Sequence, residues 1–198
     1  MRSALLLSGG MDSIAIAFWK RPDLTVTVDY GQVPARAELR AAASAAADLG
    51  IPNLVVRADL SALGSGDLAG RRELGIAPRP EWWPYRNQML VTLAAMASIP
   101  HGVTRLLVGS LATDRHHADG RPEFVEALGA LLALQEGGMT LEAPAIAMDA
   151  AQLVRESRVP PELLAWAHSC HVANEACGEC GGCRKHYRTM AALGVAPY

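Results

Sequence analysis

A glycine-rich turn near the start of the chain has the residue types that bind phosphate. Positions 8–13 read S-G-G-M-D-S and separate an apolar run at 4–7 from a helical pattern. Glycines let backbone N–H groups approach an anion, and the first turn of a helix adds about half a positive charge. The hydroxyls of Ser8 and Ser13 are potential phosphate donors, whereas the Asp12 carboxylate suits a magnesium ion or a helix cap. The spacing differs from the Walker and G-x-G-x-x-G patterns, so we predict another kind of phosphate site.

All the cysteines of the chain lie close together near its C-terminus. They are Cys170, Cys177, Cys180 and Cys183. Such clustering, without a secretion signal, favours a metal site over disulfides. Four thiolates suit a closed tetrahedral zinc site; an iron–sulfur cluster also takes four cysteines, but the spacing matches no ferredoxin pattern. We expect structural zinc, with His168, His171 and His186 at the rim of the site or, as the alternative, with one of them as a replacement ligand.

The composition indicates a folded protein without a marked affinity for polyanions or membranes. Of the 198 residues, 51% are apolar and 19% are charged, which is enough for a sizeable core. The 18 basic and 20 acidic side chains give a net charge of −2, whereas nucleic-acid binding normally needs a basic surface. No apolar run reaches the roughly 18 residues of a membrane span. We therefore expect a cytoplasmic protein.

Strands and helices are expected to alternate along the chain. Strands are predicted at 4–7, 24–29, 53–58, 105–108 and 141–143. Helices are predicted at 35–49, 86–98 and 121–136. A further helix is expected to begin at Asp12 or Ser13, and another after Asp149, which is a good N-cap. This alternation indicates an α/β fold with a doubly wound parallel sheet. We expect the sheet domain at 1–160 and a smaller cysteine-bearing segment at 161–198.

The stretch 60–85 fits neither pattern. It is rich in glycine and proline, so we expect a mobile loop or lid. The adjacent Trp82 and Trp83 could stack on a flat heterocycle, but packing in a core or an interface is the favoured interpretation.

The S-G-G-M-D-S turn after a first strand resembles the pyrophosphate loop of the PP-loop ATP pyrophosphatases. Enzymes of this superfamily cleave ATP between its α and β phosphates, which adenylates a substrate and releases pyrophosphate. The resemblance implies a sheet of the adenine-nucleotide α-hydrolase-like, Rossmann-like type, to which the smaller zinc-binding segment is attached.

Together with the four cysteines, this turn resembles the 7-cyano-7-deazaguanine synthase family over nearly the whole chain. Similar segments are V-D-Y-G-Q at 28–32, W-P-Y-R-N at 83–87, and the substrate segment of the family at 109–124. The family, which serves queuosine and deazaguanine biosynthesis, converts 7-carboxy-7-deazaguanine, ammonia and ATP to a nitrile through an acyl-adenylate. The resemblance implies an ATP-dependent carbon–nitrogen ligase that forms a homodimer, with structural zinc and with Mg²⁺ accompanying ATP.

The resemblance also implies roles for individual residues. The catalytic residues would be Asp12, Arg86 and Arg121. ATP would be bound by Leu7, Ser8, Gly9, Gly10, Met11, Asp12, Ser13, Asp29 and Gly109. The substrate would be bound by Gln32, Arg86, Asn87, Asp114 and Asp119. Some of these have simpler alternatives, because Asp114 and Asp119 also fit solvated loop charges, and Arg86 and Asn87 fit the start of a helix.

The sequence departs from the family pattern in several places. Val33-Pro34 stands where the family has Arg-His, and H-A-D-G-R at 117–121 replaces G-Y-P-D-C-R. Ala150 stands where the family has the lysine of an S/T-K-A-E motif. The spacing between Cys170 and Cys177 is also shorter than is usual in the family, and so is the whole chain.

The missing lysine bears on the chemistry, because a cation there would offset charge on the phosphates of ATP. The chain has only Lys20 and Lys185 as lysines. We expect a replacement from among three arginines: Arg86, Arg115 and Arg121.

The same departures leave other functions open. One is a divergent paralogue that forms an acyl-adenylate and joins it to a different amine. Another, motivated by Ala150, is a non-catalytic nucleotide-binding subunit. A tRNA-thiolating enzyme is disfavoured, because no basic surface is expected and all four thiols are assigned to metal.

Overall fold

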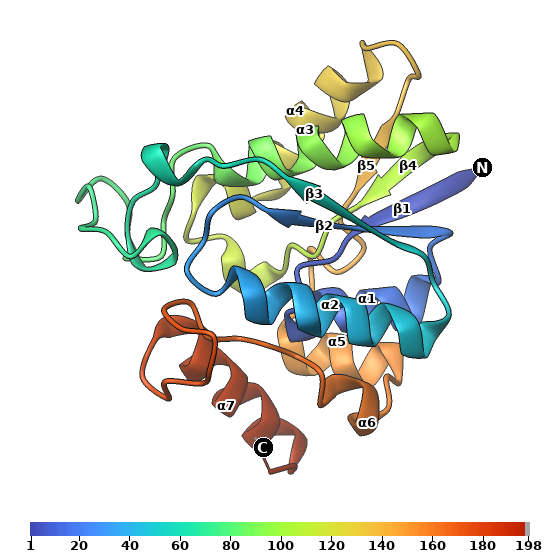
Figure 1. The fold of residues 1–198 in the computed structure, drawn as a ribbon. Helices are drawn as coiled ribbons and strands as arrows, with labels where there is room; N and C mark the ends of the chain where they lie inside the picture. Colours follow the sequence, from blue (N-terminus) through green and yellow to red (C-terminus); the bar gives the residue numbers. More distant parts are fainter. Residues whose placement is uncertain (197–198) are drawn as a thin grey trace.

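A five-stranded parallel sheet forms the centre of the protein (Figure 1). The computed structural model describes residues 1–196. In spatial order the strands are β3 (Asn53–Arg57), β2 (Leu24–Asp29), β1 (Arg2–Leu6), β4 (Val103–Leu107) and β5 (Thr140–Glu142). The order reverses beside β1, and ligands of open α/β sheets bind at the carboxyl ends of the strands at such a point. The S-G-G-M-D-S turn follows β1 at this edge.

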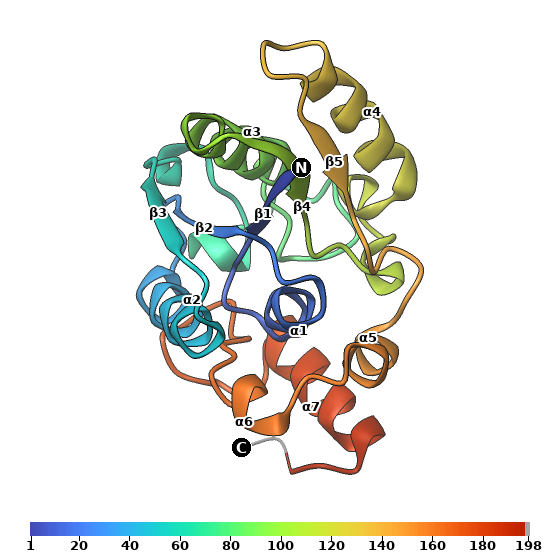
Figure 2. The same ribbon diagram turned by 90° about the vertical axis from the view of Figure 1, so that its right-hand side faces the viewer.

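Helices cover both faces of the sheet, as the doubly wound prediction required (Figures 1 and 2). On one face lie α1 (Met11–Lys20), α2 (Ala35–Leu49) and α5 (Ala150–Ser157). On the other face lie α3 (Arg86–Ser98) and α4 (Pro122–Ala133). Each face buries its own apolar cluster, the first around Leu5 and Ile14 and the second around Val26 and Leu106. The prediction of the fold class is confirmed.

The C-terminal helices α6 (Pro161–Leu164) and α7 (Gly181–Leu193) lie on the α1 side of the sheet, beside α1 and α5 (Figure 2). Leu163, Leu164 and Met190 belong to the same buried cluster as Ile14. The segment expected at 161–198 therefore shares a core with the sheet, and α7 is held close to the first helix of the chain. Among the described residues, no helix combines the length and apolarity that a membrane span requires.

The predicted strands and helices are present, and their ends differ by a few residues. The helix predicted at 121–136 begins at Pro122 and ends at Ala133, with Leu134 as its C-cap. Gly137 and Gly138, which adopt positive φ angles, lie beyond it. Short 3₁₀ turns connect the elements. They are η1 (Ser61–Leu63), η2 (Asp67–Ala69), η3 (Ile99–His101), η4 (Ala112–Asp114) and η5 (Ala118–Gly120).

The 60–85 segment is irregular but well anchored. The Ser65 hydroxyl donates to the Trp82 carbonyl over 2.7 Å, and the Asp67 amide donates to the Pro80 carbonyl over 3.0 Å. Trp83 is 2% exposed and meets Tyr30 edge to face, with ring centroids 5.1 Å apart. Core packing, the favoured interpretation of this tryptophan, is confirmed, and the movement of the segment as a lid stays a prediction.

Candidate active site

The S-G-G-M-D-S turn wraps tightly between β1 and α1 because two of its residues are glycines. Gly9 has a φ of +77°, and a Cβ there would lie 2.5 Å from the carbonyl oxygen of Glu38 in α2. The Ser13 hydroxyl donates to the Gly10 carbonyl over 2.9 Å, and its oxygen is 3.1 Å from the Ser8 hydroxyl. A glycine at position 9 thus lets the turn lie directly against α2 while its hydroxyls gather at the start of α1.

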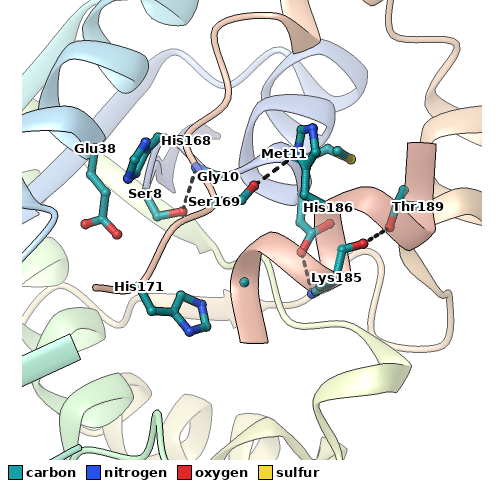
Figure 3. Close-up of a pocket in the computed structure, with 12 residues that line it drawn as sticks. Ser8, Gly10, Met11, Glu38, His168, Ser169, His171, Lys185, His186 and Thr189 are labelled. Atoms are coloured by element: carbon teal, nitrogen blue, oxygen red, sulfur yellow. Dashed lines mark hydrogen bonds and ion pairs between the residues drawn. The ribbon is translucent and has the colours of Figure 1, made fainter. Parts of the chain in front are cut away.

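A cavity of about 160 Å³ opens beside this turn (Figure 3). Its lining combines the turn with the C-terminal segment: Ser8, Gly10, Met11, Asp12, Glu38, His168, Ser169, His171, Gly182, Lys185, His186 and Thr189. In Figure 3, Glu38 and His168 lie on one side of Ser8 and Gly10, and Lys185 and Thr189 lie on the other. The cavity is smaller than the roughly 300–1,000 Å³ of typical ligand pockets, so it matches the phosphate end of a nucleotide better than a whole one.

Lys185 of α7 is the cation that contacts the turn. Its Nζ atom donates to Asp12 Oδ2 over 2.8 Å and lies 3.4 Å from Asp114 Oδ1. Burial alone would lower the pKa of Lys185, but the two carboxylates outweigh burial and hold the pKa above its ordinary value. The lysine is therefore charged at neutral pH, at the edge of the cavity.

Sequence reasoning missed this role of Lys185 and pointed to arginines instead. Arg121 is exposed and donates to the Arg115 carbonyl over 3.1 Å, and Arg115 lies 3.4 Å from the Ile146 carbonyl. Neither lines the cavity. The sequence did contain an indication of Lys185. The chain has only two lysines, Lys20 and Lys185, so either one was a candidate for the cation beside a phosphate site.

Ala150 occupies the first position of α5 and is buried in the core beside α1. The helix begins there because Asp149 forms a capping box with Gln152, accepting its amide over 2.8 Å. The predicted N-cap is therefore confirmed.

Glu38 is a further cavity residue that the sequence did not single out. Burial raises the pKa of its carboxyl from an ordinary 4.5 to about 7, against the hydrogen bond from Gln32 and the charge of Arg86. The Gln32 amide donates to Glu38 Oε2 over 2.7 Å and to the Val28 carbonyl over 3.3 Å. Its oxygen accepts the Tyr30 amide over 2.9 Å. Gln32 thus faces inward and positions Glu38.

Four other residues predicted to bind ATP or substrate lie outside the cavity lining. Asp29 ends β2 and lies 3.8 Å from Arg57, and Gly109 lies beside Ser13. Arg86 and Asn87 begin α3 and are hydrogen-bonded to each other over 3.2 Å. None of these four lines the cavity.

The two acidic residues of the substrate segment differ in their contacts. Asp114 Oδ2 accepts the Leu111 amide over 2.9 Å, while Oδ1 faces Lys185. Asp119 is half-buried in η5. Burial lowers the pKa of His117, whereas the negative charge of Asp119 favours the protonated form of this histidine. Of these two acidic residues, Asp114 is therefore the one that contacts a lining residue of the cavity, Lys185, as Gln32 contacts Glu38.

The four cysteines converge as predicted, with their sulfur atoms within 4.8 Å of one another. The Sγ atoms of Cys177 and Cys183 are 3.9 Å apart, as are those of Cys170 and Cys180. Tetrahedral zinc with bonds of about 2.3 Å places its sulfur ligands about 3.8 Å apart, so the spacing fits the ion. Backbone amides of residues 179 and 180 point at Cys177 and lower its pKa to about 6, which favours the thiolate that binds metal.

The segment that carries the cysteines is hydrogen-bonded to the glycine-rich turn and to α2. The amide of His168 donates to the Gly9 carbonyl over 2.9 Å, and Asn174 accepts the Ala37 amide from α2 over 2.8 Å. Cys180 caps α7 by accepting the Cys183 amide. A zinc ion in the cluster would therefore fix the first turn of α7 and, through it, the position of Lys185.

Comparison with known proteins agrees with this arrangement. The family model described as queuosine biosynthesis protein QueC matches residues 2–194. The 7-cyano-7-deazaguanine synthase of Desulforudis audaxviator (strain MP104C) is 33% identical over 221 residues, covering 98% of this chain and 98% of that protein. The synthase of Pseudomonas fluorescens (strain Pf0-1) is 30% identical and covers 98% and 93%, respectively. The chain belongs to the QueC family of queuosine biosynthesis proteins.

Proposed function

We propose that this chain converts 7-carboxy-7-deazaguanine, ammonia and ATP to 7-cyano-7-deazaguanine, as a cytoplasmic homodimer. The observation that carries the proposal is the cavity between the S-G-G-M-D-S turn and α7, in a chain that aligns nearly end to end with proteins named for this activity. The family resemblance supports the dimer and the location.

The reaction begins with attack of the substrate carboxylate on the α phosphorus of ATP, which expels pyrophosphate. Ammonia then displaces AMP to give an amide. The amide oxygen is adenylated by a second ATP, and loss of AMP and a proton leaves the nitrile. Little covalent chemistry falls to the protein, so its contribution is positioning and the stabilisation of charge at phosphorus.

The glycine-rich turn would hold the β and γ phosphates. Ser8 and Ser13 offer hydroxyls, and the backbone of Gly9 and Gly10 can approach closely. Lys185 would offset the charge that develops on the departing pyrophosphate, which is the function that the lysine of the family motif suggests for position 150. Lys185 is placed for this by its contact with Asp12.

Asp12 is the residue best suited to hold Mg²⁺. A carboxylate is the hard oxygen ligand that Mg²⁺ takes, and one of its two oxygens, Oδ2, bonds to Lys185. Bound with ATP, the ion would neutralise phosphate charge. The proposed contacts to the substrate are Arg86, Asn87, Asp114 and Asp119. Gln32 would contribute indirectly, by positioning Glu38 through its hydrogen bond.

The direct test is incubation of the purified chain with 7-carboxy-7-deazaguanine, ammonium and Mg-ATP. Mass spectrometry should detect the nitrile, with twice as much AMP as nitrile formed. The Asp12→Asn variant should lose this turnover, whereas Glu73→Gln, at an exposed position, should keep it. No pyrophosphate above background in the wild type would refute the proposal. Pyrophosphate release that depends on a different carboxylate would instead identify the divergent paralogue.

A further inference from the structure

Both ring nitrogens of His117, in the substrate segment, are buried without a hydrogen-bonding partner among the described residues. The side chain as a whole is 13% exposed. A buried polar group that lacks a partner is costly, so such groups normally have an explanation. The ring lies against His116, with centroids 4.4 Å apart.

A carboxylate faces both rings. Glu81 Oε1 lies 3.8 Å from His116 Nε2 and 3.9 Å from His117 Nε2. One ligand atom from each of the three residues lies within 4.8 Å of the others. Zinc with bonds of about 2.0–2.1 Å places tetrahedral nitrogen and oxygen ligands about 3.3 Å apart. The two distances from Glu81 to the histidines exceed this value by only about 0.5 Å, so small side-chain rotations would bring the carboxylate and each imidazole to the spacing of zinc ligands.

We propose that Glu81, His116 and His117 form a second metal site, separate from the cysteine cluster, which binds a divalent first-row transition ion. Two imidazoles and one carboxylate suit zinc, iron or nickel, whereas Mg²⁺ and Ca²⁺ prefer ligand sets made of oxygen alone. Three protein ligands leave coordination positions open. The ion gives the Nε2 atom of His117 the partner that it lacks.

Neighbouring residues support a cation at this place. Glu81 also belongs to a second group of ligand atoms, with Asp67 and His171, and the Nδ1 atom of His171 is likewise buried without a partner among the described residues. The charge of Asp119 also acts on His117. These carboxylates offset the nearby guanidinium of Arg86, whose charge acts on both His117 and His171.

The ion would connect segments that are distant in the sequence. Glu81 lies in the 60–85 segment, whereas His116 and His117 lie in the substrate segment, 35 and 36 positions further on. A bound metal removes conformational freedom from both segments at once. Metal binding would therefore hold the 60–85 segment over the substrate side of the active site.

Zinc stoichiometry tests the proposal without reference to activity. After equilibrium dialysis against micromolar Zn²⁺ and then against metal-free buffer, the wild type should retain two ions per chain. Glu81→Gln and His117→Gln should each retain one, and the exposed controls Glu73→Gln and His101→Gln should retain two. A single ion in the wild type, or two in His117→Gln, would overturn the proposal.

Cobalt separates the two sites. With Co²⁺ in place of zinc, Cys177→Ser should weaken the thiolate charge-transfer absorption, and His117→Gln should leave it intact. Limited trypsin digestion gives an independent readout, because Arg71 and Arg72 are exposed within the 60–85 segment. Added Zn²⁺ should slow cleavage there in the wild type and in Glu73→Gln but not in His117→Gln. Equal cleavage rates with and without Zn²⁺ in the wild type would count against the proposed connection.

Discussion

The Nζ atom of Lys185 lies 2.8 Å from Oδ2 of Asp12, although the two residues are 173 positions apart in the chain. One stands in the first turn of the first helix and the other in the last helix of the fold. Between them they bring a cation and a carboxylate to the edge of the cavity. The cysteine cluster, which precedes Lys185 directly, caps the helix that carries it.

Replacing Lys185 by Met should lower the rate of ATP-dependent pyrophosphate release about 10²- to 10³-fold, the usual loss when one donor to a developing anion is removed. Lys185→Arg should restore part of the rate, because it keeps the charge with a different shape. Lys20→Met is the matched control, since Lys20 lies over the Trp19 ring at the far end of α1. The measurement is the steady-state rate of pyrophosphate release in all three variants. An unchanged rate in Lys185→Met would show that this lysine has no part in the mechanism.

Gly9→Ala should abolish ATP binding and destabilise the fold. The new Cβ would have to occupy space 2.5 Å from the Glu38 carbonyl oxygen, in addition to the cost of a positive φ angle. Gly50→Ala provides the comparison, because Gly50 has a similar φ of +66° with nothing within 4 Å of the added atom. Thermal unfolding and nucleotide binding should both show the larger loss in Gly9→Ala. Equal losses would mean that the close approach to α2 has no effect.

Loss of metal from the cysteine cluster should impair the active site as well as stability. We expect Cys177→Ser to bind zinc weakly, to unfold at a lower temperature, and to lose pyrophosphate release at temperatures where it is still folded. The reason is that Cys180 of the cluster caps α7, and His168, two positions before Cys170, donates its amide to the Gly9 carbonyl. Ser44→Ala, a change at a half-buried position on α2 outside the cysteine cluster, serves as the reference. A folded, zinc-free variant with full turnover would contradict this coupling.

Glu38 should make the stability of the protein depend on pH. Its folded-state pKa of about 7 exceeds the ordinary 4.5, so the folded state binds this proton more tightly than the unfolded state. The resulting stabilisation is fully present below about pH 4.5 and is lost as the pH rises through about 7. Glu38→Gln removes this titration while keeping an acceptor for Gln32.

The measurement is the free energy of unfolding in urea across this pH range. Relative to Glu38→Gln, the wild type should lose stability as the pH rises, and the exposed Glu73→Gln should follow the wild type. Parallel curves for the wild type and Glu38→Gln would show that burial does not shift the pKa of this carboxyl.

Local patterns were enough to predict most of the fold. The β-branched run at 24–29 forms β2 over those same residues, and the helix at 86–98 matches α3. Asp149 caps its helix as expected, because capping depends on residues three positions apart. The parallel sheet follows from alternating strands and helices, since a right-handed crossover leaves few other arrangements.

The sequence by itself determined the helices and strands, the glycine-rich turn between β1 and α1, and the grouping of the four cysteines, because each of these depends on a short stretch of chain. Only the tertiary structure decided that Lys185 supplies the cation beside Asp12, that Glu38 borders the cavity, and that His117 meets Glu81. These contacts join segments from different parts of the fold, and burial and the charges of neighbours set their properties. Distances of this kind arise when helices pack on a sheet, and no local pattern of residues records them.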